Sequence, residues 1–191
     1  MTLESMYPKR DFLTNLNHIL DFQINDLKCC VQRANFLVAV GCMNTIEFLG
    51  GIRNGELGMP GRVESRFKEG VRLLPPDNGV RRLDRLTQPV DEETMWQLRN
   101  GLTHQYLPKV NAVASIFIGA GVTAGTRYNA IGEIQRASES VSVKGPILSV
   151  DVDSLVQAIE QGRGKLLEEL RTDSAKRSGA EKALSRLPEL L

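Results

Sequence analysis

Hydrophobic residues recur at helical spacing through the N-terminal quarter of the chain. Between Phe12 and Leu49 an apolar or small residue returns every three or four positions, which is the period of a helix that buries one stripe. The pattern continues as far as the glycine pair 50–51, which favours a stop. It allows one long helix or an antiparallel pair broken near Asn25. We favour one long helix or two nearly continuous ones.

Two further helices are predicted in the middle of the chain. The first, 62–74, follows a glycine-dense loop and ends at the proline pair 75–76, because proline lacks an amide hydrogen and restricts its predecessor. The second begins at the acidic run 91–93, where the helix dipole favours negative charge, and it ends at Pro108.

The character of the sequence then changes from helical to strand-like. The segments 113–118 and 141–150 are rich in Val, Ile and Ser and predict two strands of a hairpin or small sheet. A last core helix is expected from Asp151, which suits an N-cap, to Arg171.

Together these elements predict a mainly α fold, an antiparallel helical bundle with a small β-hairpin insertion before the last core helix. At 191 residues the chain has room for a single domain, which we place at 1–171 with the insertion at about 110–150. The charged tail, 172–191, predicts a loosely attached helix.

Charge restricts the kinds of partner that the chain can bind. Its 24 basic and 23 acidic residues nearly cancel, so it lacks the positive excess of a protein that coats nucleic acid. The segment 62–86 contains seven basic and four acidic residues, a local excess of three positive charges (7 − 4). A solvated helix face is the simpler interpretation of such a run.

The cysteines and the N-terminus point to a cytoplasmic protein. Cys29, Cys30 and Cys42 form no C-x-x-C pair and have no histidines at metal-ligand spacing, so neither a disulfide framework nor a metal site is predicted. The first residues lack the basic start and apolar stretch of a secretory signal. The longest uncharged run, 110–126, contains three glycines and is too polar to favour a membrane span.

Chemistry-bearing residues gather in the second of the two middle helices. On a helical wheel Met95, Leu98, Leu102 and Tyr106 share one side, whereas Asn100, Thr103 and His104 lie together on another, with Arg99 at the boundary. The helix thus presents an amide, a hydroxyl, an imidazole and a guanidinium to one region.

This set of groups suits cleavage of a phosphodiester. A guanidinium fork matches phosphate oxygens and stays charged, and an imidazole near neutral pH can accept or deliver a proton. Because one histidine cannot easily do both in one turnover, the chemistry predicts a two-fold dimer that brings two such helices together.

The stretch Arg99-Asn100-Gly101-Leu102-Thr103-His104-Gln105-Tyr106 resembles the R-x-x-x-x-H-x-Y signature of the HEPN superfamily, including its polar residue after the arginine. HEPN proteins are small helical bundles that commonly dimerise so that both motifs face one cleft. Many are metal-independent RNases that act as toxins of toxin–antitoxin pairs or in phage defence, often with a nucleotidyltransferase as antitoxin. Others in the superfamily lack activity.

Carried over to this chain, the resemblance implies a role for each motif residue. His104 would be the catalytic histidine and Arg99 the phosphate-stabilising group, with Asn100 and Thr103 supporting them. Tyr106 would be the site that a nucleotidyltransferase modifies, and it equally suits a core aromatic. No metal or other cofactor is expected.

Two other functions compete with the RNase hypothesis. One is a non-catalytic HEPN-like module that binds RNA, a nucleotide or a partner protein, and the other is a helical adaptor that uses the motif helix for packing. Trp96 and His18 are expected to be structural. The glycines of 119–125 mimic a dinucleotide-binding turn, but too few residues follow for a Rossmann sheet, so a flexible connection is the better interpretation.

Overall fold

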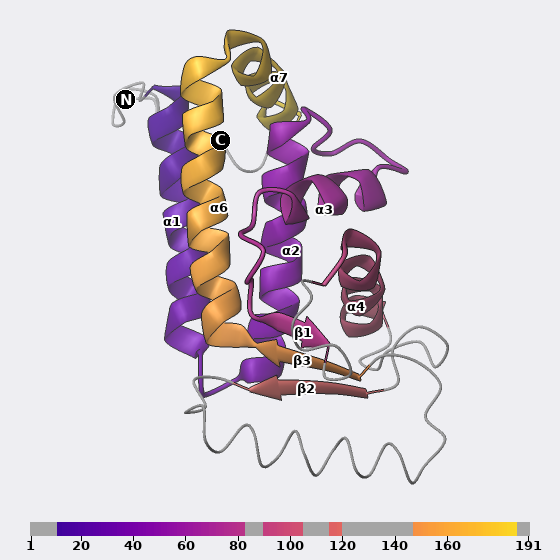
Figure 1. Cartoon of the computed structure of the whole chain (residues 1–191). Helices are drawn as coiled ribbons and strands as arrows, with labels where there is room; N and C mark the ends of the chain where they lie inside the picture. Colours follow the sequence, from indigo (N-terminus) through magenta and orange to yellow (C-terminus); the bar gives the residue numbers. More distant parts are fainter. Residues whose placement is uncertain (1–10, 83–89, 105–114, 120–146, 187–191) are drawn as a thin grey trace, which may run out of the picture.

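The computed structural model describes residues 11–82, 90–104, 115–119 and 147–186. This part of the chain is mainly α, with six helices packed together beside a small sheet (Figure 1). The helices are α1 (Phe12–Cys30), α2 (Asn35–Arg53), α3 (Val63–Val71), α4 (Glu92–His104), α6 (Val152–Thr172) and α7 (Ser174–Leu184). The long helices α1, α2 and α6 lie side by side, with the sheet at one end and α7 at the other (Figure 1).

The N-terminal hydrophobic stripe belongs to two helices that run in opposite directions (Figure 1). Our preference for one long helix or two nearly continuous ones was wrong, and the antiparallel pair is observed, with its break at 31–34, later than Asn25. Gln32 there has a φ of 68°, a conformation that no helix continues, and its N–H donates to Asn35 Oδ1 at 2.8 Å. An apolar stripe of constant period fits either arrangement, because it records burial and not direction.

Helix α2 is the centre of the core. Ten of its residues are buried, and it contacts α1, α3, α4, α6 and α7. By length and composition it could cross a membrane, but 56% of its apolar window is buried inside the molecule. That burial is typical of the core helix of a globular domain. Burial in α2 also raises the pKa of the Cys42 thiol to about 12.

Helix α3 crosses α2 with the two backbones in contact. A Cβ added to Gly50 would lie 1.8 Å from the carbonyl oxygen of Arg66, and one added to Gly70 would lie 1.8 Å from that of Ile46. No side chain fits at either position, so both glycines are required for this close approach. The helix predicted at 62–74 is observed as α3, which ends at Val71, before the proline pair, and it is held firmly against the core.

The C-terminal part of the chain completes the bundle. The predicted helix after Asp151 is observed as α6, although the Asp151 carboxylate accepts a hydrogen bond from the Ser154 hydroxyl at 2.9 Å and does not cap the helix backbone. The tail, expected to be a loosely attached helix, forms α7. Because Ala180, Ala183 and Leu184 of α7 are buried in the core cluster, that helix is anchored and not loose.

The sheet differs from the predicted hairpin. Its strands are β1 (Val80–Arg82), β2 (Ser115–Gly119) and β3 (Ile147–Asp151), in the order β1-β3-β2. Strand β2 pairs with β3 in parallel, from Ser115 opposite Ile147 to Gly119 opposite Asp151, while β1 pairs with β3 in antiparallel. Two strands joined as a hairpin must be antiparallel, so the hairpin prediction was wrong. The composition of the strands predicted their existence but not their direction.

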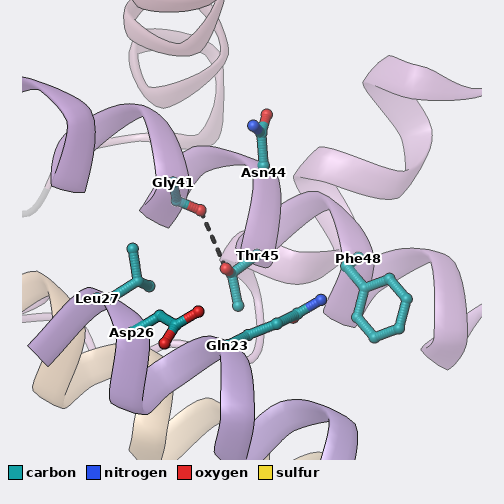
Figure 2. Close-up of a pocket in the computed structure, with 7 residues that line it drawn as sticks. All are labelled: Gln23, Asp26, Leu27, Gly41, Asn44, Thr45 and Phe48. Carbon is teal, nitrogen blue, oxygen red and sulfur yellow. Dashed lines mark hydrogen bonds between the residues drawn. The ribbon is translucent and has the colours of Figure 1, made fainter.

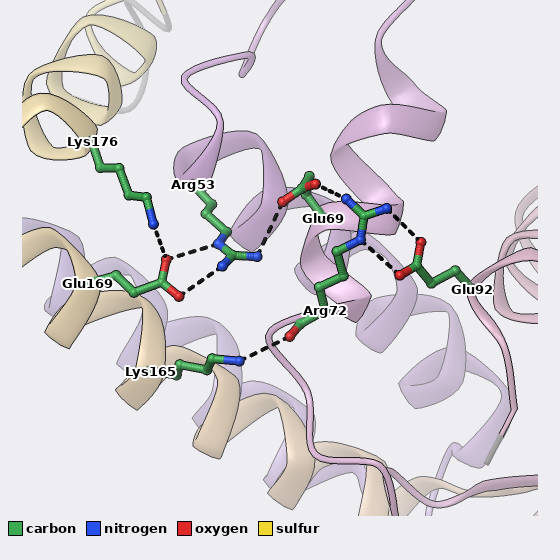
Figure 3. A network of polar contacts seen from close by, with 7 residues as sticks. All are labelled: Arg53, Glu69, Arg72, Glu92, Lys165, Glu169 and Lys176. Carbon is green, nitrogen blue, oxygen red and sulfur yellow. Dashed lines mark hydrogen bonds and ion pairs between the residues drawn. The ribbon is translucent and has the colours of Figure 1, made fainter. Parts of the chain in front are cut away.

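A chain of ion pairs connects five of the helices (Figure 3). Arg53 of α2 binds Glu169 of α6 at 2.9 Å and Glu69 of α3 at 3.2 Å. Glu169 also accepts from Lys176 of α7 at 3.0 Å. Arg72, directly after α3, pairs with Glu69 and, at 2.8 Å, with Glu92 at the start of α4. The network links the C-terminal helix with the first turn of the motif helix.

Candidate functional site

The motif lies on α4, whose first turn is well defined. The Thr94 N–H donates to Asp91 Oδ1 at 2.7 Å, and the Met95 N–H donates to the Asp91 carbonyl, so Asp91 caps the helix. These hydrogen bonds from Thr94 hold the pKa of Asp91 below its usual value. Met95, Leu98 and Leu102 are buried, as the helical wheel predicted, and they orient the other faces of the helix.

Arg99 turns inward from α4 to a carboxylate on α2. Its Nη2 donates to Glu47 Oε2 at 2.7 Å. Arg66 of α3 binds the other oxygen of the same carboxylate, with Nη2 at 2.7 Å and Nε at 3.3 Å from Oε1. The side chains of Arg66 and Arg99 are each 10% exposed and that of Glu47 is 16% exposed. The arrangement is an Arg–Glu–Arg cluster contributed by three helices.

Two neighbours on α4 complete the surroundings of Arg99. Its guanidinium carbon lies 5.4 Å from the centroid of the Trp96 ring, within the range of a cation–π contact. The Trp96 ring centroid in turn lies 5.9 Å from that of Phe67 of α3, and Trp96 is partly buried against the core, in line with the structural role expected of it. Asn100 Oδ1 accepts a long hydrogen bond of 3.4 Å from Arg99 Nη1. Of the motif residues, Arg99 and Asn100 are thus in contact.

Thr103 and His104 are the last described residues of the motif. Both belong to the last turn of α4, and His104 is the final residue of that helix. The helical backbone separates positions 99 and 104 by about 7.5 Å along the axis. Tyr106 lies outside the described residues, as does Pro108. The glycine-rich stretch also lies outside them, except for Gly119 at the end of β2.

The locally basic segment is largely paired with carboxylates. Lys68 binds Glu64 and Glu93, and these hydrogen bonds raise the pKa of Lys68 and lower that of Glu93. Arg81 pairs with Asp77 at 3.0 Å. Arg66 and Arg72 have the carboxylate partners given above. Four basic residues of this segment therefore form ion pairs within the molecule, namely Arg66, Lys68, Arg72 and Arg81.

Sequence reasoning missed Glu47, which binds Arg99, and Arg66, which binds the same carboxylate. Glu47 carries a usable signal, because it is the one charged residue between Asn35 and Ile52. A charge inside an otherwise uncharged, buried helix needs a partner of opposite sign. Arg66 carried no such signal, because it lies among other charged residues and resembles them.

A shallow pocket of about 410 Å³ opens between α1 and α2 (Figure 2). Its lining residues are Gln23, Asp26, Leu27, Gly41, Asn44, Thr45 and Phe48. The Thr45 hydroxyl donates to the Gly41 carbonyl at 3.0 Å, and neither Arg99 nor Asn100 lines the pocket. Within the described part of the chain, no three His, Cys, Asp or Glu side chains gather as metal ligands.

The Arg–Glu–Arg cluster supplies buried, oriented guanidinium groups beside a helix that ends in a histidine. Such an arrangement can fix positive charge where an anion accumulates. Comparison of the chain with protein-family models, curated proteins and solved structures finds no match. The function therefore has to be argued from the residues themselves.

Proposed function

We propose that the protein is a HEPN-like homodimer that cleaves RNA without a metal ion, through Arg99 and His104 of both subunits. The observation that carries the proposal is the placement of both residues on α4, with Arg99 held by Glu47 at 2.7 Å. The helical bundle around α4 is compatible with the HEPN-like architecture that the motif implies.

In this mechanism His104 accepts the proton of a ribose 2′-hydroxyl as its oxygen attacks the phosphorus. The bond to the 5′-oxygen breaks, and His104 of the partner subunit protonates that leaving group. Arg99 stabilises the negative charge that grows on the phosphate oxygens. The products are a 2′,3′-cyclic phosphate and a 5′-hydroxyl. Asn100 and Thr103 support the two reacting groups, and Tyr106 is the site for a nucleotidyltransferase antitoxin.

The direct test is incubation of the purified protein with mixed RNA in the presence of EDTA. We expect cleavage by the wild type and a loss of at least about a hundredfold in His104→Ala, consistent with removal of a general acid–base group. His18→Ala is the matched control, because His18 lies on α1, away from the motif. Equal cleavage by wild type and His104→Ala would remove the enzymatic claim.

One observation favours the second candidate, a non-catalytic HEPN-like module that binds RNA, a nucleotide or a partner protein. Arg99 as a whole residue is only 8% exposed and already carries an ion pair, which suits a structural or binding group better than a catalytic cation that must reach a phosphate. This alternative expects RNA binding that weakens in Arg99→Ala, without product. A gel-shift assay run on the samples of the cleavage assay separates the two functions.

We also propose that the protein is cytoplasmic and that the two subunits of the dimer contact each other through α4. Sedimentation equilibrium checks the dimer, which is required because one chain supplies a single motif histidine. A chain that stays monomeric at concentrations at which it cleaves RNA would contradict the composite site.

A further inference from the structure

We propose that Glu47 is the positioning residue of Arg99, and that Arg66 fixes Glu47 for this task. The inference deepens the proposed function, on which its catalytic meaning rests. Neither Glu47 nor Arg66 belongs to the motif, and they come from α2 and α3 rather than α4.

The carboxylate of Glu47 divides its two oxygens between the two arginines. Oε1 accepts from Nε and Nη2 of Arg66, and Oε2 accepts from Nη2 of Arg99. Charge-assisted hydrogen bonds of this kind are short and directional, so the plane of the carboxylate sets where the Arg99 guanidinium lies. A mobile arginine at the same place would have to be ordered again in every turnover.

Arg66 is itself held by further contacts, at the third nitrogen of its guanidinium and at its backbone. Its Nη1 donates to the carbonyl oxygen of Met59 at 2.8 Å and, more weakly, to that of Glu56 at 3.4 Å. Its backbone carbonyl lies at the point where α3 touches Gly50 of α2. Arg66 therefore links the Glu47 carboxylate to a part of the fold where the backbones cannot shift independently.

The order of contacts runs from the fixed backbone to Arg66, then to Glu47, then to Arg99. The last two steps are short polar contacts between side chains that are at most 16% exposed. In surroundings with little water, a preorganised charge stabilises a developing anion more strongly than a charge that must reorient. Loss of Glu47 should consequently lower the rate of the chemical step more than it weakens the binding of RNA.

The first measurement is the NMR order parameter of the Arg99 Nε–H bond in the full chain, in wild type and in Glu47→Gln. We expect a value near 0.85 in wild type and below about 0.6 in the variant, the ranges of rigid and flexible groups. Glu169→Gln is the matched control, because Glu169 also holds an arginine and is 20% exposed. An Arg99 value in Glu47→Gln equal to that of the control overturns the inference.

The second measurement is the steady-state kinetics of RNA cleavage in EDTA for the same proteins. Glu47→Gln should lower kcat by about ten- to a hundredfold with KM within about twofold, whereas Glu169→Gln should change neither. Should Glu47→Gln fail to fold, Glu47→Asp replaces it, because aspartate keeps the charge but holds its carboxylate one methylene further from Arg99. Glu47→Asp should also lower the Arg99 order parameter and kcat. Unchanged kcat in a cleaving protein overturns the catalytic role.

The two proposals fail in different ways. A wild type that does not cleave RNA removes the proposed function, while the order parameter still decides whether Glu47 positions Arg99. A wild type that cleaves RNA, together with an unaltered Glu47→Gln variant, removes only the inference.

Discussion

Glu47 lies between two guanidinium groups in a helix that is otherwise apolar over most of its length. A charge in such surroundings is expensive unless it is paired, and loss of one partner leaves the others uncompensated. The residue thus holds α2, α3 and α4 together in addition to its role at the site.

Glu47→Ala should lower the free energy of unfolding by about 3 kcal/mol, because Arg66 and Arg99 would then face each other without the carboxylate between them. Urea denaturation measures the change. Glu160→Ala is the control, because Glu160 pairs with Lys28 at a site where both side chains are more than 40% exposed, and it should cost less than about 1 kcal/mol. Equal losses in the two variants would contradict the buried character of the Glu47 cluster.

The three cysteines should differ sharply in reactivity. The pKa of Cys42 is raised to about 12 by burial, so its thiolate is scarce at pH 8, whereas Cys29 and Cys30 are exposed. A thiol reagent such as iodoacetamide, followed by mass spectrometry, should modify Cys29 and Cys30 in the folded protein and Cys42 only after denaturation. Rapid modification of Cys42 in the folded protein would show that the α2 core opens easily.

At the scale of single residues, the sequence predicted part of the candidate site. The chemistry of Arg99 and the contact with Asn100 could be anticipated from adjacent residues on one helix. Glu47 and Arg66 could not be anticipated, because Glu47 lies 52 residues from Arg99 in the chain and Arg66 lies 19 residues from Glu47. Only the packing of three helices brings them together.

At the scale of helices, the crossing of α2 and α3 depends on two glycines. Gly50→Ala should lower stability by at least about 3 kcal/mol, because its Cβ would lie 1.8 Å from a backbone oxygen that cannot move without displacing α3. Gly164→Ala on α6 is the control. Nothing lies within 4 Å of a Cβ there, so helix propensity should stabilise the protein by about 0.5–1 kcal/mol. Thermal and urea unfolding of both variants measure these opposite signs.

The start of the motif helix should respond to pH through Asp91. The pKa of Asp91 is lower in the folded state than in the unfolded chain. The charged cap therefore stabilises the folded protein fully at pH values above the pKa that Asp91 has in the unfolded chain. This stabilisation is lost as the pH falls through the pKa that Asp91 has in the folded protein. Asp91→Ala should therefore cost about 1 kcal/mol at pH 7, and the difference from wild type should shrink below about pH 4. Urea titrations at pH 7 and pH 3 check this.

The control for the cap is Asp91→Asn. An asparagine keeps an acceptor for the Thr94 N–H but does not titrate, so most of the stability should remain with less dependence on pH. A difference between wild type and Asp91→Ala that is the same at both pH values would contradict a charged cap.

Helices were easier to predict than the way they are joined. The starts of α3, α4 and α6 follow from acidic residues and apolar spacing, which act within a few residues, whereas α3 ends at Val71, before the proline pair 75–76. The reversal between α1 and α2 and the parallel pairing of β2 with β3 depend on contacts between distant segments. An apolar or β-branched run predicts burial or a strand, but it carries no record of direction.

At the scale of the whole molecule, polar contacts run from the C-terminal helix to the motif. The ion pairs of Figure 3 connect α7 with the first turn of α4, and the Glu47 cluster holds the middle of α4 against α2 and α3. The helix that carries Arg99 and His104 is thereby fixed from two sides. Such support is what a site that acts by fixed charge requires.

The measurement that tests this account most directly is mass spectrometry of the RNA ends formed in EDTA by wild type and by His104→Ala purified in parallel. The account predicts new 2′,3′-cyclic phosphate and 5′-hydroxyl ends with wild type only. New ends at equal amounts with both proteins, or no new ends with wild type, would contradict it.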